Sequence, residues 1–221
     1  MQSNKSDTAV YRQKLTRALA ASMAAWAGFG ALAGLVLGGY TLEFDEQILQ
    51  AIHSASNVQL DRFFSFATEL GGFYAVTVIG LVLVGWLIKT NRKVSAIMVV
   101  FGVAGAGLVN VLLKLIFERP RPDLWEQIVL EGSFSFPSGH AMASSSIALS
   151  CIIVSWRTKW RMPVLFVSVV YIVLIGVSRL YLGVHYPSDV IGGWLASLGW
   201  VSLVFYLVGK FLLVRPAAAV K

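Results

Sequence analysis

The chain has 221 residues, of which 57% are hydrophobic and 13% are charged, and its mean hydropathy is +0.74. Soluble domains carry about 25% charged residues, so the composition excludes an ordinary soluble protein and predicts an integral membrane protein. The single cysteine, Cys151, excludes an intrachain disulfide, and the distribution of the net charge of +7 argues against a nucleic-acid partner.

Six uncharged stretches divide the chain, each close to the roughly 20 residues that a helix needs to cross a bilayer. They run over residues 18–40, 70–88, 94–113, 141–156, 162–178 and 190–209. The fourth and fifth are short and need to extend into their polar flanks. Because irregular backbone cannot face lipid, the stretches must form packed helices. We therefore predict an all-α polytopic membrane protein with six transmembrane helices in a single domain over residues 1–221.

The first stretch resembles a signal peptide in its basic flank and its small residues. Its 23 uncharged residues exceed the about 7–15 apolar residues of a usual signal peptide, so we expect this helix to be retained. Gly30, Gly34 and Gly38 recur every four residues, a spacing that lets helices approach closely.

Residues 43–69, between the first two stretches, place apolar residues at helical spacing beside acidic ones. We predict a short amphipathic helix on the outer membrane surface, where it could shape the path of a lipid. A linker helix packed on the bundle fits the same pattern equally well. His53 lies here without a motif around it and is interpreted as structural.

Lysines and arginines are concentrated on one side of the predicted bundle. Thirteen of the 18 basic residues fall in the two terminal segments and in the turns after the second and fourth stretches. Ten of the 11 acidic residues fall on the other side. The positive-inside rule then puts both termini in the cytoplasm of a cell-membrane protein. Three polar motifs fall together at helix ends on the extracytoplasmic face, which favours a single site.

The first motif places Lys114 seven residues before Arg121, with Pro120 and Pro122 flanking the arginine. The prolines stop the helix and stiffen the turn that carries Arg121. A lysine offers a point charge and an arginine a planar fork, so the two can grip a phosphate from different directions. Alternatively, both side chains simply extend toward lipid headgroups.

The second motif, Pro137-Ser138-Gly139-His140, stands just before the fourth stretch. Backbone amides of Ser138, Gly139 and His140 would open a helix, and free amides at a helix N-terminus bind anions. Gly139 permits a close approach of the backbone. His140 would lie over the bound group, where a proton donor is needed. The alternative is a capped helix start with an incidental histidine.

The third motif runs from Ser178-Arg179 to His185 and Asp189. Pro187 favours a helix start, so His185 lies in the preceding loop and the Asp189 carboxylate can reach back to one ring nitrogen. That contact would fix the tautomer and leave the other nitrogen as a nucleophile or base. Arg179 adds a third cation. The alternative is a helix-capping aspartate beside an unrelated histidine.

Together, K-x6-RP, PSGH and SR-x5-H-x3-D resemble the three signatures of the type-2 phosphatidic acid phosphatase superfamily. That family includes membrane lipid phosphate phosphatases, soluble acid phosphatases and vanadium haloperoxidases. All three signatures match in order, and the six-stretch layout fits the membrane branch. Within this branch the chain resembles the bacterial phosphatidylglycerophosphate phosphatases of the B type and their relatives that act on polyprenyl diphosphate.

The resemblance implies hydrolysis of a lipid phosphate ester at the outer membrane face. His185 would be the nucleophile that forms a phosphohistidine, Asp189 would orient it, and His140 would protonate the departing alkoxide and later activate water. The residues implied to bind the phosphoryl oxygens are Lys114, Arg121, Ser138, Gly139 and Arg179. Three fixed cations can replace a metal, so we expect no metal or cofactor.

The implied partners are the bilayer and a lipid substrate, with no nucleic acid. Phosphatidylglycerophosphate is the first candidate, and phosphatidate and undecaprenyl diphosphate share the same phosphate chemistry. A transporter with an anion pathway is the alternative from another class, although transporters place their sites near the midplane rather than at helix ends. Phosphate release by the purified protein separates the two classes.

Other enzyme classes find less support in the sequence. Cys151 and Arg157 have the spacing of a cysteine-phosphatase loop, but apolar residues of a predicted span lie between them, so an inert thiol is expected. The sequence lacks the G-x-S-x-G elbow of serine hydrolases and the H-E-x-x-H motif of zinc proteases.

Overall fold

Each of the six apolar stretches lies largely within a helix of the computed structural model, which describes residues 2–126, 129 and 131–214, with side chains from residue 9 to residue 211. The elements are α1 (Gln2–Leu37), α2 (Leu42–His53), α3 (Val58–Glu69), α4 (Phe73–Lys89), α5 (Lys93–Phe117), α6 (Gly139–Ser155), α7 (Arg161–Tyr181) and α8 (Pro187–Val214). Within the described residues all regular secondary structure is helical, which confirms the predicted all-α class.

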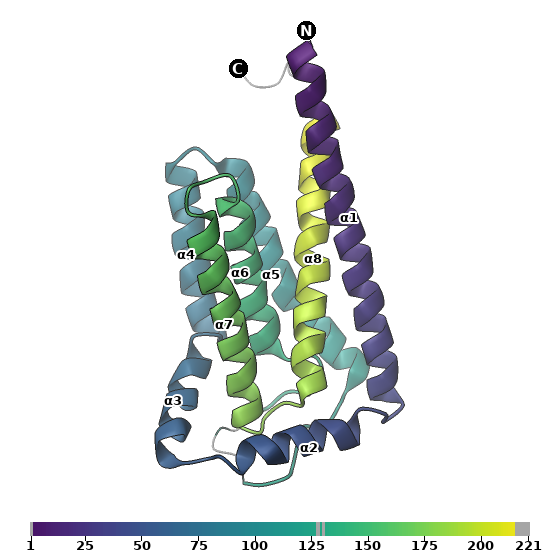
Figure 1. Cartoon of the computed structure of the whole chain (residues 1–221), viewed down its shortest axis with the longest axis vertical. Coiled ribbons are helices and arrows are strands. Elements are labelled where there is room, and N and C mark those ends of the chain that lie inside the picture. Colours follow the sequence, from purple (N-terminus) through teal and green to yellow (C-terminus); the bar gives the residue numbers. More distant parts are fainter. Residues whose placement is uncertain (1, 127–128, 130, 215–221) are drawn as a thin grey trace.

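The long helices run roughly along one direction, with α1 beside α8 and with α4, α5, α6 and α7 grouped on the other side of α8 (Figure 1). Small residues permit the close approach of α1 and α8. A Cβ atom on Gly199 would lie 2.8 Å from the indole nitrogen of Trp26, and the hydroxyl of Ser22 donates to the carbonyl of Gly199 at 2.8 Å. α2 lies across one end of the bundle and α3 stands beside α7 at the same end.

The starts of α6 and α8 meet at this end. A Cβ atom on Gly193 would lie 2.8 Å from the carbonyl oxygen of Ser138, so only glycine lets the α8 backbone lie so close to the start of α6. The amide of Ser138 also donates to the carbonyl of Asp189 at 3.0 Å. Backbone contacts therefore join the second and third motifs.

By length and composition, four helical segments qualify as membrane spans: Ala9–Leu37, Lys93–Phe117, Arg161–Tyr181 and Pro187–Phe211. The pair α3 and α4, bent by 46° at the break between them, would add a fifth. α6 has only 17 residues, because it starts after its cap, Ser138, and ends before a turn at Trp156. The predicted six spans are therefore not confirmed: the fifth stretch extends to 21 residues in α7, but the fourth stays short.

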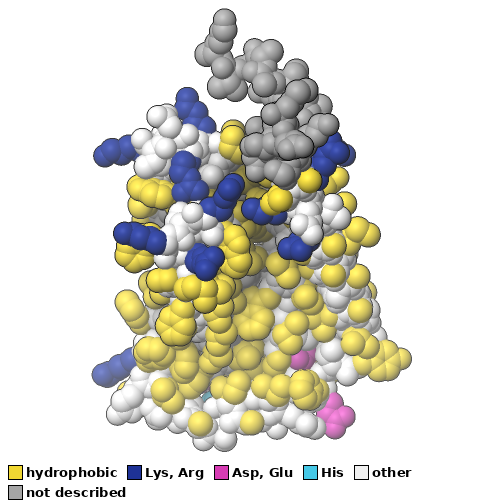
Figure 2. All heavy atoms as spheres, turned by 45° about the horizontal axis from the view of Figure 1, so that its top comes forward, with side chains coloured by type: hydrophobic (Ala, Val, Ile, Leu, Met, Phe, Trp, Pro, Cys, Tyr) yellow, Lys and Arg dark blue, Asp and Glu magenta, His cyan; other side chains and the backbone are white. Residues whose placement is uncertain are grey.

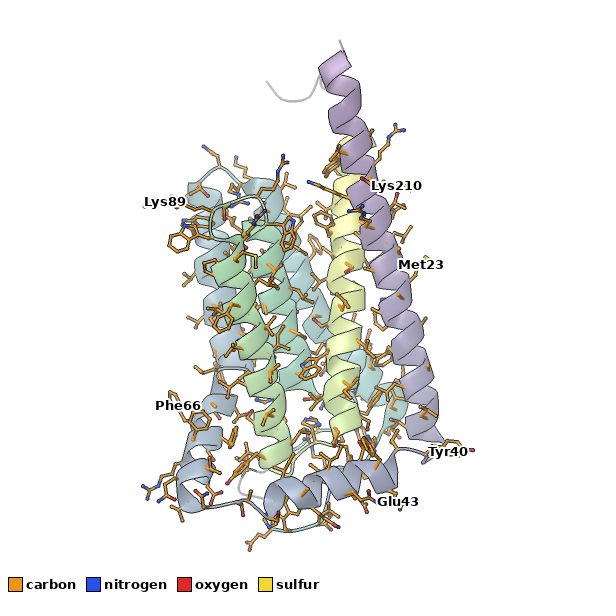
Figure 3. The ribbon with its side chains drawn as sticks, viewed as in Figure 1. Met23, Tyr40, Glu43, Phe66, Lys89 and Lys210 are labelled. Atoms are coloured by element: carbon orange, nitrogen blue, oxygen red, sulfur yellow. The ribbon has the colours of Figure 1, made fainter. Side chains whose placement is uncertain are left out.

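The segment after α1 forms two helices where one was predicted. The helix is interrupted at residues 54–57, and Asn57 caps α3 by accepting hydrogen bonds from the amides of Gln59 and Leu60. Figure 3 shows Tyr40, Glu43 and Phe66 pointing away from the bundle at this end. The interfacial location of these helices stays a prediction.

Basic side chains gather at the opposite end of the bundle (Figure 2), where Lys89 and Lys210 lie in Figure 3. This separation of charge along the bundle agrees with the pattern used for the predicted orientation. Arg215 and Lys221, which the prediction also counted, lie outside the described residues, as do the side chains of Lys5 and Asp7.

Candidate active site

His185 and Asp189 form a buried pair at the start of α8. Pro187 is the first residue of the helix, which puts Asp189 in the first turn and His185 in the loop before it. Asp189 Oδ2 lies 3.4 Å from His185 Nδ1 and accepts a hydrogen bond from the amide of Tyr186 at 2.8 Å. The side chains of His185 and Asp189 are 1% and 0% exposed. The structure therefore brings together the two residues that the third motif predicts to interact.

Two further side chains complete the hydrogen bonding of this carboxylate. The hydroxyl of Ser135 donates to Asp189 Oδ2 at 2.5 Å, and Arg119 NH1 donates to Asp189 Oδ1 at 2.6 Å. With both oxygens acting as acceptors, a hydrogen on His185 Nδ1 faces the carboxylate and leaves the lone pair on Nε2. Sequence reasoning missed both donors, since Ser135 lies outside the motifs and Arg119 stands at an unspecified position of the first motif.

Lys114 and Arg121 meet beside the histidine through the loop at residues 133–134. Arg121 NH1 lies 3.1 Å from His185 Nε2, and Arg121 Nε donates to the carbonyl of Ser133 at 2.7 Å. The amine of Lys114 donates to the hydroxyl of Ser133 at 3.0 Å and to the carbonyl of Phe134. Arg121 is thus held next to Nε2, and Lys114 is bound to the same loop.

Glu131, also missed from the sequence, connects the remaining site residues. It forms an ion pair with Arg179, lies 3.7 Å from Arg121, and its Oε1 lies 4.0 Å from Nδ1 of His140. Arg179 also donates to the hydroxyl of Thr68 at 2.7 Å, while its Nε has no hydrogen-bond partner among the described residues. The Glu131 carboxylate therefore lies between two guanidinium groups and a histidine.

The second motif contributes less to the cavity than predicted. Ser138 is buried, its amide is taken by the Asp189 carbonyl, and its hydroxyl accepts from the amide of Ala141 at 3.4 Å. Gly139 and His140 do line the cavity. The anion contact expected from the Ser138 amide is therefore not available in this arrangement, whereas Gly139 and His140 remain candidates.

A cavity of about 540 Å³ lies in front of these groups. The motif residues that line it are Lys114, Arg121, Gly139, His140 and His185. Its opposite side is apolar and continues into a groove of about 580 Å³ along α4 and α5. Phe73, Gly107, Val111 and Ala143 line both spaces. The cavity thus combines a cationic wall with an apolar outlet.

Burial and charge decide the protonation of the loop residues. Burial lowers the pKa of His185 well below its ordinary value, and the positive charges of Arg179 and Arg121 lower it further, so the imidazole is neutral at pH 7. Burial alone would raise the pKa of Glu131, but the charge of Arg179 and the other neighbouring cations outweigh it and keep that pKa below its ordinary value. The site therefore holds a neutral nitrogen base beside an ionised carboxylate.

The described residues contain no group of three His, Cys, Asp or Glu side chains that could hold a metal ion. Cys151 lies in α6, where it lines a separate apolar groove with Tyr171 and Val167.

The comparisons with known proteins agree with this geometry. The profile of the PAP2 superfamily matches residues 95–212, a range that contains all three motifs. Phosphatidylglycerophosphatase B of Bacillus subtilis is 42% identical over 109 residues, which cover 47% of this chain and 51% of that protein. The alignment thus spans about half the length of this relative.

Two further comparisons cover more of the chain. Undecaprenyl-diphosphatase BcrC of Bacillus subtilis is 30% identical over 179 residues, which cover 77% of this chain and 86% of that protein. The crystal structure of a transmembrane PAP2-type phosphatidylglycerolphosphate phosphatase from Bacillus subtilis superposes with a TM-score of 0.74 at 28% identity. That superposition covers 90% of this chain and 98% of the other.

Proposed function

The chain belongs to the PAP2 superfamily, and on this premise we propose that it hydrolyses the phosphate ester of a membrane lipid. Family membership and the phosphatase names of its relatives support a phosphoric monoester hydrolase. The substrate we propose is phosphatidylglycerophosphate, which would be converted to phosphatidylglycerol and phosphate. The cavity, whose cationic wall continues into an apolar groove, is the observation that carries the lipid assignment.

The shape of the two joined spaces suits an amphiphile. A soluble phosphate ester would need only the cationic wall, whereas a lipid also needs a place for its tail beside the reacting group. The shared lining by Gly107 and Val111 provides that continuity, and the tail would lie along α4 and α5. Apolar tail contacts of this kind supply binding energy that soluble esters lack.

We propose that the phosphate displaces the Glu131 carboxylate and takes the donors of Arg179, Arg121 and Lys114. Arg121 then turns its hydrogen bonds from His185 Nε2 to phosphoryl oxygens and leaves the Nε2 lone pair facing phosphorus. Three positive charges around the equatorial oxygens stabilise the transition state, because phosphoryl transfer depends mainly on positioning and charge neutralisation.

In the chemical step, His185 Nε2 attacks phosphorus, an N–P bond forms, and the bond from phosphorus to the lipid oxygen breaks. The negative charge of the bound phosphate would favour a proton on His140, and His140 gives this proton to the departing oxygen. In the second step His140 takes a proton from water, the water oxygen attacks phosphorus, and the N–P bond breaks to release phosphate. Asp189 balances the positive charge that develops on His185 in both steps.

A second substrate, undecaprenyl diphosphate, has support of its own. The undecaprenyl-diphosphatase relative aligns over 77% of this chain, compared with 47% for phosphatidylglycerophosphatase B. The phosphate-binding residues proposed above would serve either lipid. The substrate is therefore decided by the tail and by the group that leaves.

We further propose that α1, α4, α5, α6, α7 and α8 all cross the membrane, with both termini cytoplasmic and the site facing outward. The basic side chains at the far end of the bundle support this orientation (Figure 2). α4 and α6 would both span with 17 residues each, and α6 is shielded from lipid by its neighbours α5, α7 and α8. α2 and α3 would then lie at the outer interface, where the exposed Phe44 and Phe66 suit the headgroup region.

Phosphate release by the full-length protein in detergent tests the function. We expect turnover of phosphatidylglycerophosphate or undecaprenyl diphosphate in the presence of a chelator, no turnover by His185→Ala, and a severe loss with trapped covalent phosphate in His140→Ala. Normal turnover by either variant would refute the assigned roles. Inhibition by the chelator, reversed by a divalent ion, would refute the metal-independent mechanism.

A further inference from the structure

Arg119 lies behind Asp189 and does not line the cavity. Its NH1 donates to Asp189 Oδ1 at 2.6 Å and to the hydroxyl of Ser188 at 2.7 Å, and its NH2 donates to Asp45 Oδ2 at 2.9 Å. The guanidinium carbon also lies 4.1 Å from the ring centroid of Tyr186. Arg119 is therefore held between α2 and the start of α8 without reaching the space where substrate would bind.

Asp45 brings α2 into this network. It is 1% exposed, and its Oδ1 accepts a hydrogen bond from the amide of Ser188 at 2.9 Å, while its Oδ2 accepts from the Ser188 hydroxyl. Amides in the first turn of a helix have no partner within the helix, so the bond from the Ser188 amide makes Asp45 a cap of α8. Asp45 lies 143 positions before Ser188 in the chain. The turn that carries Asp189 is thus fixed by a side chain from another helix.

The two carboxylates in this network share one positive charge. Two buried carboxylates, those of Asp45 and Asp189, share the guanidinium of Arg119, whose side chain is 10% exposed. A buried carboxylate without a partner charge is strongly unfavourable. Because the donors of a guanidinium have fixed directions, the bond to Asp45 sets the angle at which Arg119 meets Asp189.

We propose that Arg119 and Asp45 are positioning residues, which hold Asp189, and through it the imidazole of His185, in the orientation that the reaction needs. The inference rests on the proposed function, because that function gives the histidine its role as nucleophile. It assigns to α2, which lies across the end of the bundle, a part in catalysis that does not involve contact with substrate (Figure 1).

The test compares kcat, KM and the inhibition constant for inorganic phosphate in the full-length protein. Arg119→Gln should lower kcat about 100-fold, the loss that a small misplacement of a reacting group causes. KM and the inhibition constant should stay within about twofold, because the cavity lining is unchanged. Arg119→Lys should have a kcat about tenfold higher than that of Arg119→Gln, because the charge remains while the planar fork is lost.

Asp45→Asn keeps an oxygen acceptor for Ser188 but removes the charge opposite Arg119, and it should lower kcat about fivefold, again without a change in KM. Arg62→Gln is the matched control, because Arg62 is an exposed basic residue of α3 outside the network, and it should keep the kcat of the wild type. Thermal unfolding of each variant in detergent reports whether the fold is retained.

Wild-type kcat in Arg119→Gln, or a loss that appears as a raised KM, would overturn the inference. So would a loss in the glutamine variant that lysine does not relieve, since that result indicates packing rather than charge. If Arg119→Gln does not fold, the lysine and Asp45→Asn variants decide, and wild-type kcat in both refutes the proposal. A wild-type protein that releases no phosphate refutes the proposed function instead, and an active His185→Ala refutes the role of His185 as the nucleophile.

Discussion

The two histidines that line the cavity differ in burial and in the hydrogen bonding of their acidic partners. On the α8 wall, His185 and Asp189 are 1% and 0% exposed, and the carboxylate accepts hydrogen bonds from three groups besides the imidazole. On the α6 wall, His140 and Glu131 are 23% and 22% exposed, and their closest polar atoms are 4.0 Å apart. The first pair is buried and held by several hydrogen bonds, whereas the second pair is partly exposed and its two members are not hydrogen-bonded to each other.

This difference matches the tasks that we assign to the two walls. A nucleophile gains from being held in one orientation, since rearrangement during the reaction would add to the barrier. A group that must exchange protons with a leaving lipid and then with water has to be accessible. In our proposal Glu131 leaves its ion pair with Arg179 when phosphate binds, which a partly exposed side chain in a loop can do.

Replacing Asp189 disrupts the buried pair of His185 and Asp189 and should have the largest effect. Asp189→Asn keeps the size of the side chain but loses the charge that pairs with Arg119 and holds the tautomer of His185. We expect kcat to fall about 10⁴-fold, by analogy with the orienting aspartate of a Ser-His-Asp triad. Single-turnover phosphate release measures the loss.

Asp123→Asn, which alters an exposed carboxyl group of the loop after α5, serves as the control and should retain wild-type turnover. A loss below about tenfold in Asp189→Asn would mean that the carboxylate does not set the orientation of the nucleophile.

The corresponding change at Glu131, beside His140, should alter the binding of phosphate rather than the orientation of the nucleophile. Glu131→Gln removes a negative charge that competes with phosphate for Arg179 and Arg121. We expect inorganic phosphate to inhibit about tenfold more strongly, which corresponds to about 1.4 kcal/mol. Glu126→Gln, an exposed residue of the same loop, should leave the inhibition constant unchanged. Weaker inhibition in Glu131→Gln would contradict the competition.

The burial of His185 also predicts how the stability of the protein depends on pH. The pKa of His185 is lowered well below its ordinary value by burial, whereas in the unfolded chain it lies near about 6.5. As pH falls below about 6.5, the unfolded state takes up a proton that the folded state does not, so stability falls by up to about 1.4 kcal/mol per pH unit. Above that pH the histidine adds no slope.

Unfolding midpoints in detergent between pH 7.5 and 5.0 test this slope. His185→Gln should lose less stability than the wild type over the acidic part of the range, because it has no imidazole to protonate at this position. Equal slopes in the two proteins would show that the buried imidazole does not resist protonation.

The sequence predicts the parts of this comparison that rest on local signals. Each uncharged stretch lies largely within a helix, since apolar length and composition are properties of a single segment. His185 and Asp189 meet because they are four positions apart across the start of a helix. The break between α2 and α3 also had a local signal, the capping residue Asn57, which the amphipathic pattern obscured.

The parts that the sequence does not predict are contacts between distant residues. Asp45 meets Ser188 across 143 positions, and Arg119 meets Asp189 across 70, so no local pattern marks either contact. Asp45 looked like one acidic residue on the polar face of a surface helix. Glu131 lies outside every motif, and its role follows only from the convergence of Arg179, Arg121 and His140 around it.

The smallest effect should come from the apolar groove along α4 and α5, at a point away from the catalytic groups. Gly80 of α4 lines this groove, and a Cβ atom there would meet nothing within 4 Å. Gly80→Leu should therefore fill part of the groove without moving His185 or Asp189. We expect about a threefold rise in KM for a long-chain lipid phosphate, as for the loss of part of one apolar contact, with unchanged kcat for a short-chain analogue.

Gly85 provides the matched control on the same helix. A Cβ atom there also meets nothing within 4 Å, but Gly85 does not line the groove. Gly85→Leu should leave both substrates unaffected, because it adds the same side chain to the same helix without entering the tail space. If the two leucine variants behave alike, or if Gly80→Leu slows the short-chain analogue equally, then the groove does not hold the tail. The substrate would then enter the cavity by another route, while the predictions for His185 and Asp189 would stand.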